Sequence, residues 1–310
     1  MKLAFMGTPE FALPTLKALI NSDNHDLCLV ITQPDRPRGR GRRLEPPPVK
    51  AEAIKYNIPV FQPEGIKDRK VYDILRQNNL DAVVVVAYGK IIPEDMLHLP
   101  RYGFINIHAS LLPLYRGAAP INRVIIDGFK TTGISIMQID AGMDTGPVYM
   151  QAEVSIEERD DAIILSERLA ELGAEKLLET LTLIEKGEIE PLPQDHQKAT
   201  YAPMLKKEEG VINWESDPVT ICNLIRGLVP WPCAFTSMDS KPIKIWRASY
   251  LIQTHSIVPG TLIKEGKGVK IACKGGFIIP EKVQPAGKKI MDASAFACGL
   301  KTGSVFLVNL

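Results

Sequence analysis

The stretch DAVVVVA, residues 81–87, holds four consecutive valines between two alanines. A half-exposed strand alternates apolar and polar residues, whereas this run is apolar on both faces. Strands of this kind lie in the middle of parallel sheets whose two faces are covered by helices. The run therefore predicts a buried parallel sheet and an α/β fold.

Short apolar runs and amphipathic runs alternate on both sides of this stretch. Strands are expected at residues 3–6, 27–32, 103–108 and 133–140, and helices at 9–20, 49–56, 67–77, 118–127 and 160–186. In the first helix we expect Thr8 as N-cap and Pro9 as the first helical residue. This alternation predicts a doubly wound, mostly parallel, Rossmann-like sheet over residues 1–187.

The character of the sequence changes after Gly187. Residues 188–207 contain three prolines and no sustained period, which is typical of a linker. Beyond it, one helix is expected at 219–228, with short strands at 243–246, 268–273, 276–279 and 304–308. This spacing predicts a small antiparallel β-barrel, OB-like, over residues 208–310.

Composition excludes several classes of protein. The five cysteines form no CxxC pair, so we expect no disulfide framework and no metal site. No apolar run approaches the roughly 18 residues of a membrane span, and a cytoplasmic protein is expected. The net charge is +1, but from Glu208 onward 12 Lys and Arg stand against 8 Asp and Glu. That excess weakly indicates an anionic partner.

Polar side chains interrupt the apolar strand in GFINIHASLLPLYRGAAPI, residues 103–121. Asn106 and His108 share one face of it. They also lie at its carboxyl end, where ligands bind in open α/β sheets. The alternative to a functional site is a structural histidine whose ring is hydrogen-bonded to a backbone carbonyl. With Asn106 on the same face as His108, the functional and the structural interpretation are about equally supported.

A second candidate segment is the Gly-rich loop IDAGMDTGP, residues 139–147, which carries Asp140 and Asp144. Gly142 and Gly146 allow the backbone to bend closely around a ligand. The alternative for Asp144 is a turn residue that caps local amides.

Together, NIHASLLP and GMDTGP resemble the active-site signature of the folate-dependent formyltransferases. The resemblance implies that Asn106, His108 and Asp144 are catalytic, with 10-formyltetrahydrofolate as cosubstrate. It also implies folate contacts from two segments: Ser110, Leu111, Leu112 and Pro113 in one, and Val86, Ala87, Tyr88 and Gly89 in the other.

These residue types suit formyl transfer to an amine. Attack on the formyl carbon creates an oxyanion, which the Asn106 amide can stabilise; one such donor is worth about 3–4 kcal/mol of barrier. His108 can donate to the same oxygen or move the proton of the amine. Asp144 would orient the imidazole and favour its charged form. The sequence does not fix which group takes that proton.

The acceptor is indicated by the stretch TQPDRPRGRGRRLEPPPVK, residues 32–50. Its arginines are Arg36, Arg38, Arg40, Arg42 and Arg43. A solvated basic loop is the plain interpretation, but clustered guanidinium groups also bind a phosphate backbone. The segment 34–49 resembles the inserted loop of those formyltransferases that act on methionyl-tRNA, and the similarity continues through TYAPMLKKEEGVINW and RGLVPWPCAF.

This second resemblance implies initiator methionyl-tRNA as partner, bound by those arginines and by Lys206 and Lys207. A monomer is expected, because it suits an enzyme that wraps a large RNA. Two alternatives stay open: a formyltransferase acting on a nucleotide-linked amino sugar, and a noncatalytic RNA-binding protein on an enzyme scaffold. The turn at Met6–Pro9 lacks the further glycines of a dinucleotide site, so a nicotinamide enzyme is rejected.

Overall fold

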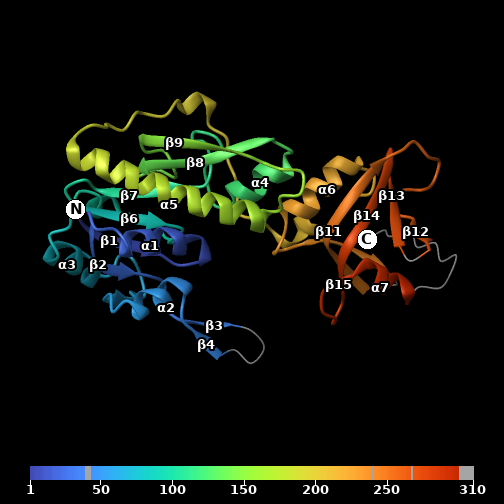
Figure 1. Cartoon of the computed structure of the whole chain (residues 1–310), viewed down its shortest axis with the longest axis horizontal. Helices are drawn as coiled ribbons and strands as arrows, with labels where there is room; N and C mark the ends of the chain where they lie inside the picture. The colour runs from blue at the N-terminus through green and yellow to red at the C-terminus, as the bar shows by residue number, and fades with distance from the viewer. Residues whose placement is uncertain (39–42, 239–240, 267, 300–310) are drawn as a thin grey trace. The chain divides into compact units, whose positions relative to one another are not determined.

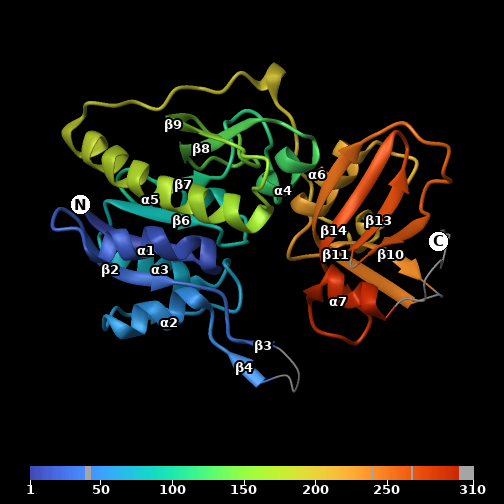
Figure 2. The same cartoon turned by 45° about the vertical axis from the view of Figure 1, so that its right-hand side comes forward.

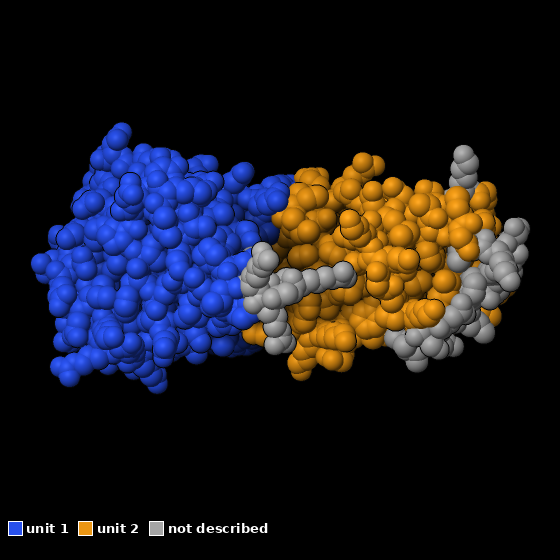
Figure 3. Space-filling model, turned by 90° about the horizontal axis from the view of Figure 1, so that it is seen from below, with its two compact units in different colours: residues 1–120, 131–155, 166–202 blue, residues 121–130, 156–165, 203–310 orange. Residues whose placement is uncertain are grey.

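The computed structural model describes residues 1–38, 43–238, 241–266 and 268–299 (Figure 1). The chain divides into two compact units, coloured separately in Figure 3. The first contains residues 1–120, 131–155 and 166–202, and the second contains residues 121–130, 156–165 and 203–310. The first unit thus continues to residue 202, and the boundaries expected at 187 and 207 stay a prediction.

The first unit is built on a seven-stranded sheet in the order β5-β2-β1-β6-β7-β8-β9. Its strands are β1 (Lys2–Gly7), β2 (Asp26–Ile31), β5 (Val60–Phe61), β6 (Ala82–Val86), β7 (Phe104–His108), β8 (Thr131–Gln138) and β9 (Val148–Ser155). All pairs from β5 to β7 are parallel, and β8 and β9 continue the sheet antiparallel. The expected doubly wound, mostly parallel fold is confirmed.

Helices cover this sheet (Figures 1 and 2). They are α1 (Leu13–Ile20), α2 (Pro48–Lys55), α3 (Arg69–Gln77) and α5 (Ala162–Lys186). The valine run is fully buried in β6, as its composition predicts. Val83 and Val85 join Phe104 in an apolar cluster with Val71 and Leu75 of α3.

The opposite face of β7 lies against α5. A Cβ added at Gly173 would lie only 2.8 Å from a side-chain carbon of Ile107, so glycine allows this close approach. Because alternate residues face opposite ways, Asn106 and His108 continue the face of Phe104 and point away from α5.

The start of the first helix differs from expectation. A short 3-10 turn, η1 (Glu10–Ala12), precedes α1, and Thr8 does not cap it. The Thr8 hydroxyl donates instead to the carbonyl of Tyr88, 3.4 Å away. The prediction was wrong because a contact from a distant turn replaces the local cap.

Four strands of the first unit were not expected. β9 pairs with β8, and β5 forms the edge of the sheet beside β2. The arginine-rich stretch contains a two-stranded hairpin, β3 (Arg36–Arg38) and β4 (Arg43–Glu45), in which Arg36 pairs with Glu45. We call residues 36–45 the arginine hairpin.

The second unit contains an antiparallel sheet in the order β10-β11-β14-β13-β12, with β15 beside β14. Its elements are α4 (Pro120–Ile126), α6 (Pro218–Gly227), β10 (Ala234–Met238), β11 (Lys241–Ile252), β12 (Leu262–Glu265), β13 (Gly268–Cys273), β14 (Gly276–Pro285), β15 (Met291–Asp292) and α7 (Ala293–Cys298). The expected antiparallel domain is confirmed, and the strand expected at 304–308 lies outside the described residues.

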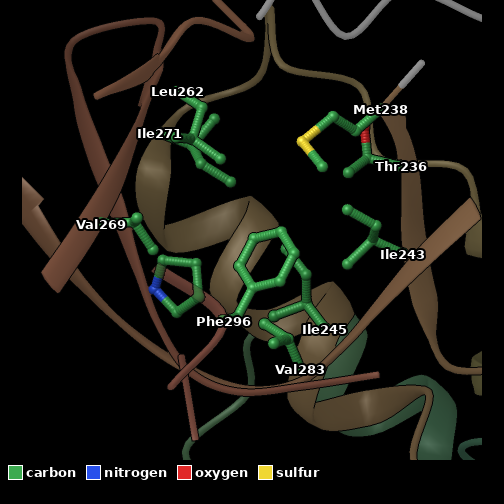
Figure 4. A pocket seen from close by; sticks show the side chains of 10 residues that line it. Thr236, Met238, Ile243, Ile245, Leu262, Val269, Ile271, Val283 and Phe296 are labelled. Carbon is green, nitrogen blue, oxygen red and sulfur yellow. The ribbon is translucent and has the colours of Figure 1, made fainter. Parts of the chain in front are cut away.

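The interior of this second sheet is apolar. Figure 4 shows a small cavity there, lined by side chains such as Ile245, Leu262, Ile271, Val283 and Phe296. No charged side chain lines it, so it is a core feature rather than a site for an anionic partner. None of the helices within the described ranges is long and apolar enough to cross a membrane.

Candidate active site

The candidate site lies where β6 and β7 end. The two strands are parallel neighbours, with Val85 beside Asn106, so their carboxyl ends meet at one edge of the sheet. Residues 86–89 leave β6 there, and residues 109–117 leave β7. The fold therefore brings the two predicted folate-contacting segments together beside Asn106 and His108.

His108 is buried, and both of its ring nitrogens have defined surroundings. Nε2 lies 3.0 Å from the carbonyl oxygen of Tyr115. A carbonyl can only accept, so Nε2 carries a hydrogen. Nδ1 lies 3.6 Å from Oδ2 of Asp144, which is longer than a direct hydrogen bond. The backbone contact expected for a structural histidine is thus present, but it leaves Nδ1 available to exchange a proton beside a carboxylate.

Asp144 is held by a segment distant in the sequence. The backbone N–H of Gly117 donates to its Oδ2 at 2.8 Å. The local capping role weighed for Asp144 belongs instead to Asp140, whose Oδ1 accepts from the Gly142 N–H at 3.0 Å and the Thr145 hydroxyl at 2.7 Å. Asp144 itself has a backbone φ of 53°, in the left-handed region that L-residues rarely adopt. Its carboxylate is therefore directed toward His108 rather than into its own turn.

Asn106 is half-buried on the same face of β7 as His108. Among the described residues, no hydrogen bond of its side-chain amide is found. An amide that is not engaged by the protein can donate to a substrate oxygen, which is what an oxyanion requires.

The turn Ser110–Pro113 is fixed from the neighbouring strands. The buried Ser135 hydroxyl on β8 donates to the carbonyl of Ser110 at 2.7 Å and accepts from the N–H of Leu112 at 3.0 Å. Gln151 on β9 donates to the carbonyl of Leu112 at 2.8 Å. Sequence reasoning missed both side chains. Ser135 was detectable, because it is a polar residue between the apolar Ile134 and Ile136 in the buried middle of β8.

The second predicted folate segment, Val86–Gly89, is a turn with left-handed backbone at Ala87 and Gly89, both exposed. Tyr88 is buried, and burial raises the pKa of its hydroxyl to about 12. Its carbonyl accepts from the side-chain amide of Gln33 at 3.2 Å, in addition to Thr8. The turn thus presents main-chain groups and is anchored to the segment that precedes the arginine hairpin.

The predicted linker takes part in the site. The N–H of Tyr115 donates to the Thr200 hydroxyl at 2.8 Å, and the N–H of Arg116 donates to the Thr200 carbonyl at 2.9 Å. Gln194 and Arg116 are both buried and bonded to one another. Nothing in the aperiodic, proline-rich sequence around Gln194 indicates these contacts.

The predicted tRNA-contacting residues are described only in part. Arg36 is exposed, whereas Arg40 and Arg42 lie outside the described residues. For Arg38 and Arg43 the structure describes the backbone alone, in β3 and β4. At the base of the arginine hairpin, Lys50 forms a 2.8 Å ion pair with Asp35, which closes the two ends of the segment against each other.

Lys206 and Lys207 belong to the second unit, and both are exposed. The N–H of Lys206 donates to Oε1 of Glu209 at 2.7 Å, at the turn η4 (Lys207–Gly210). Arg123 of α4 pairs with the same carboxylate, which fixes the turn that carries both lysines. Within the described ranges, no group of three or more His, Cys, Asp or Glu side chains could hold a metal ion.

Two family models match this chain. The model for formyl transferases matches residues 1–181, and the model for their C-terminal domain matches residues 204–301. The chain belongs to the formyltransferase family. The formyltransferase fold thus holds the His108–Asp144 pair within the first matched region.

Curated relatives match this formyltransferase over nearly its full length. A methionyl-tRNA formyltransferase of Acetivibrio thermocellus is 46% identical over 98% of this chain and 98% of its own. One of Geobacter metallireducens is also 46% identical, over 97% and 96%.

Solved structures share the fold at lower identity. The N-formyltransferase of Helicobacter canadensis, in complex with folinic acid and dTDP-3-aminofucose, superposes with a TM-score of 0.68 at 19% identity. The match covers 92% of this chain and 99% of that one. At this identity the likeness supports the fold alone.

Proposed function

We propose that this formyltransferase transfers the formyl group of 10-formyltetrahydrofolate to the amino group of initiator methionyl-tRNA in the cytoplasm, for translation initiation. The observation that carries formyl transfer is the 3.6 Å approach of His108 Nδ1 to the Asp144 carboxylate. Asn106 lies on the same face of β7 as His108, and its side-chain amide has no hydrogen bond to the described residues. The acceptor rests on the curated relatives and on the arginine hairpin.

In the proposed reaction, the amine attacks the formyl carbon and the carbonyl oxygen becomes an oxyanion. Asn106 donates its amide N–H to that oxygen, which stabilises charge formed only in the transition state. A proton leaves the amine and is exchanged at His108 Nδ1, directly or through a water, while the Asp144 carboxylate stabilises the resulting imidazolium. Collapse of the intermediate returns a proton to the folate nitrogen and breaks its bond to the formyl carbon.

The donor is proposed to lie between the two turns at the strand ends. Leu112 is buried, whereas Leu111 and Pro113 are half-exposed and can contact an apolar ring. The exposed backbone at Ala87 and Gly89 offers main-chain groups to the polar edge of a pterin. The Helicobacter enzyme, which shares this fold, was solved with the related folinic acid.

A tRNA acceptor is favoured over an amino sugar by the density of positive charge near residue 40. Five arginines lie within residues 36–43, far more than one nucleotide-linked sugar needs for its phosphates. Guanidinium groups gain affinity for a nucleic-acid backbone through bidentate contacts and counterion release. The Asp35–Lys50 ion pair closes the base of this segment within the first unit.

A formyl-transfer assay with radiolabelled donor tests the acceptor. The purified full chain is offered initiator methionyl-tRNA, uncharged initiator tRNA and a nucleotide-linked amino sugar in parallel. Label on the charged tRNA alone is expected. Label on the sugar alone would establish the competing sugar activity, and transfer to neither would support a noncatalytic role.

A further inference from the structure

Gln194 has a buried side chain whose hydrogen-bonding groups are all used, and its three partner residues include the proposed catalytic Asp144. Its Oε1 accepts from Nε and Nη2 of Arg116 at 3.1 and 2.7 Å. Its Nε2 donates to the carbonyls of Asp144 and Gly146 at 2.9 and 2.7 Å. A buried amide satisfied on both sides joins two loops that are distant in the sequence.

The orientation of this amide is fixed by its partners. A guanidinium can only donate, so the amide oxygen must face Arg116. The NH₂ group then faces the two backbone carbonyls, which can only accept. The guanidinium is itself buried, and its Nη2 lies 3.1 Å from Nδ1 of His196, so it has no freedom to release the amide.

Asp144, whose carbonyl accepts a hydrogen bond from Gln194, has an unfavourable backbone conformation. Asp144 has φ of 53°, a value that an L-residue keeps only when its surroundings impose it. Gln194 holds the carbonyl of this residue, while the Gly117 N–H holds its carboxylate. Gln194 is bound by Arg116, and Gly117 is the next residue in the chain. Both restraints on Asp144 therefore depend on the same short stretch, residues 116–117.

The segment that carries Gln194 is itself tied down on each side. Leu192 exchanges backbone hydrogen bonds of 2.9 and 2.8 Å with Val148, just beyond the Asp144 loop. Ala202 donates its N–H to the carbonyl of Arg116 at 2.7 Å. A segment that the sequence alone suggests to be a linker therefore braces the loop that carries Asp144.

We propose that Gln194, oriented by Arg116, is a positioning residue for formyl transfer: it holds the Asp144 backbone so that the carboxylate faces His108. This inference rests on the proposed function of Asp144. It predicts that loss of the two donations from Gln194 lowers the rate of the chemical step without weakening the binding of either substrate.

The substitution Gln194→Glu isolates this effect. It keeps the size of the side chain and its contact with Arg116, but it replaces the NH₂ donor by an oxygen that repels the two carbonyls. Gln197→Glu is the matched control, because Gln197 is exposed on the same segment. We expect kcat of Gln194→Glu to fall about 10- to 100-fold, with both KM values within about twofold of wild type. The control is expected to retain wild-type kinetics.

A double-mutant cycle with Asp144→Asn separates positioning from general damage. If Gln194 acts through the Asp144 carboxylate, Gln194→Glu costs less than about twofold in the Asp144→Asn background. If the loss of kcat in the double variant instead equals the product of the losses in the two single variants, the proposal is overturned. Full activity of Asp144→Asn alone would instead show that the proposed catalytic site is wrong.

Hydrogen exchange at the Gly117 amide gives a readout that needs no activity. This N–H is protected by the Asp144 carboxylate, so Gln194→Glu is expected to speed its exchange at least tenfold while the amides of β6 keep wild-type rates. Unchanged exchange at Gly117 would overturn the positioning role, whatever the kinetics show. A global rise in exchange, including β6, would mean that Gln194 supports the fold rather than this loop, which also contradicts the proposal.

Discussion

The carboxylate of Asp144 lies 3.6 Å from Nδ1 of His108, and its position is set by groups that themselves have no direct part in the chemistry. The same oxygen that faces the imidazole accepts the Gly117 N–H at 2.8 Å. Nε2 of the imidazole is fixed on the carbonyl of Tyr115. Both side chains are thus oriented before a substrate binds, which lowers the cost of reaching the transition state.

Asn106 provides the clearest separation between catalysis and folding. Asn106→Ala is expected to lower kcat about 10²–10³-fold, because one oxyanion donor is lost. KM values and the thermal midpoint should change little, since the amide makes no hydrogen bond to the described part of the protein. Steady-state kinetics and thermal unfolding check this, with the exposed Asn24→Ala as control. A midpoint that falls together with activity would indicate a structural role.

Ser135 tests the donor side of the site. Ser135→Ala removes the hydroxyl that binds the Ser110 carbonyl and the Leu112 N–H, and it leaves buried groups unpaired. We expect a loss of about 1–3 kcal/mol in the free energy of unfolding and a raised KM for the folate donor. KM for tRNA should stay unchanged. A rise in KM for tRNA alone would contradict the assignment of this turn to the donor.

The arginine hairpin tests the acceptor side. Combined substitution of Arg40, Arg42 and Arg43 by Ala should raise KM for methionyl-tRNA and leave KM for the donor unchanged. The slope of log affinity against log salt should become shallower by about 2–3, because up to three phosphate contacts are lost.

The matched control for the hairpin removes the same charge elsewhere. Lys67, Arg69 and Lys70 are exposed near the start of α3 and can be changed to Ala together. This triple variant should keep nearly the wild-type salt slope. Equal slopes in both triple variants would show that total charge, and not the hairpin, governs binding.

The turn that carries Lys206 and Lys207 predicts a pH dependence of stability. The Arg123 guanidinium beside Glu209 lowers the pKa of that carboxyl below its ordinary value. The contribution of the charged form to stability is therefore present above the unfolded pKa of about 4.3 and is lost as pH falls through the lower folded value. Wild type should unfold at a higher temperature than Glu209→Gln at pH 7, with the difference shrinking below about pH 4. A difference that is constant with pH would contradict this origin.

The main features of the fold could be predicted because they rest on periodicity. The valine run of β6, the helices against it and the shared face of Asn106 and His108 follow from apolar patterns and the two-residue repeat of strands. The start of α1 could not be predicted, because the Thr8 hydroxyl donates to Tyr88, 80 residues away in the sequence. Local capping rules do not include such contacts.

In the candidate site, too, some residues could be predicted from the sequence and others could not. Asn106, His108 and Asp144 carry a recognisable pattern, although their roles stay predictions until variants are measured. Gln194 carries no pattern, because its contacts depend on a segment folding back over loops more than 40 residues away. Residues that brace a site through backbone carbonyls leave no periodic trace in the sequence.

The most direct test of the account is the single-turnover rate of formyl transfer to initiator methionyl-tRNA by wild type and Asp144→Asn, with both substrates saturating. The substitution keeps the size of the side chain and removes its charge. We predict a rate at least about 100-fold lower, with unchanged equilibrium binding of the tRNA and an unchanged thermal midpoint. Transfer at the wild-type rate by Asp144→Asn would contradict the central claim that the His108–Asp144 pair carries out the chemistry.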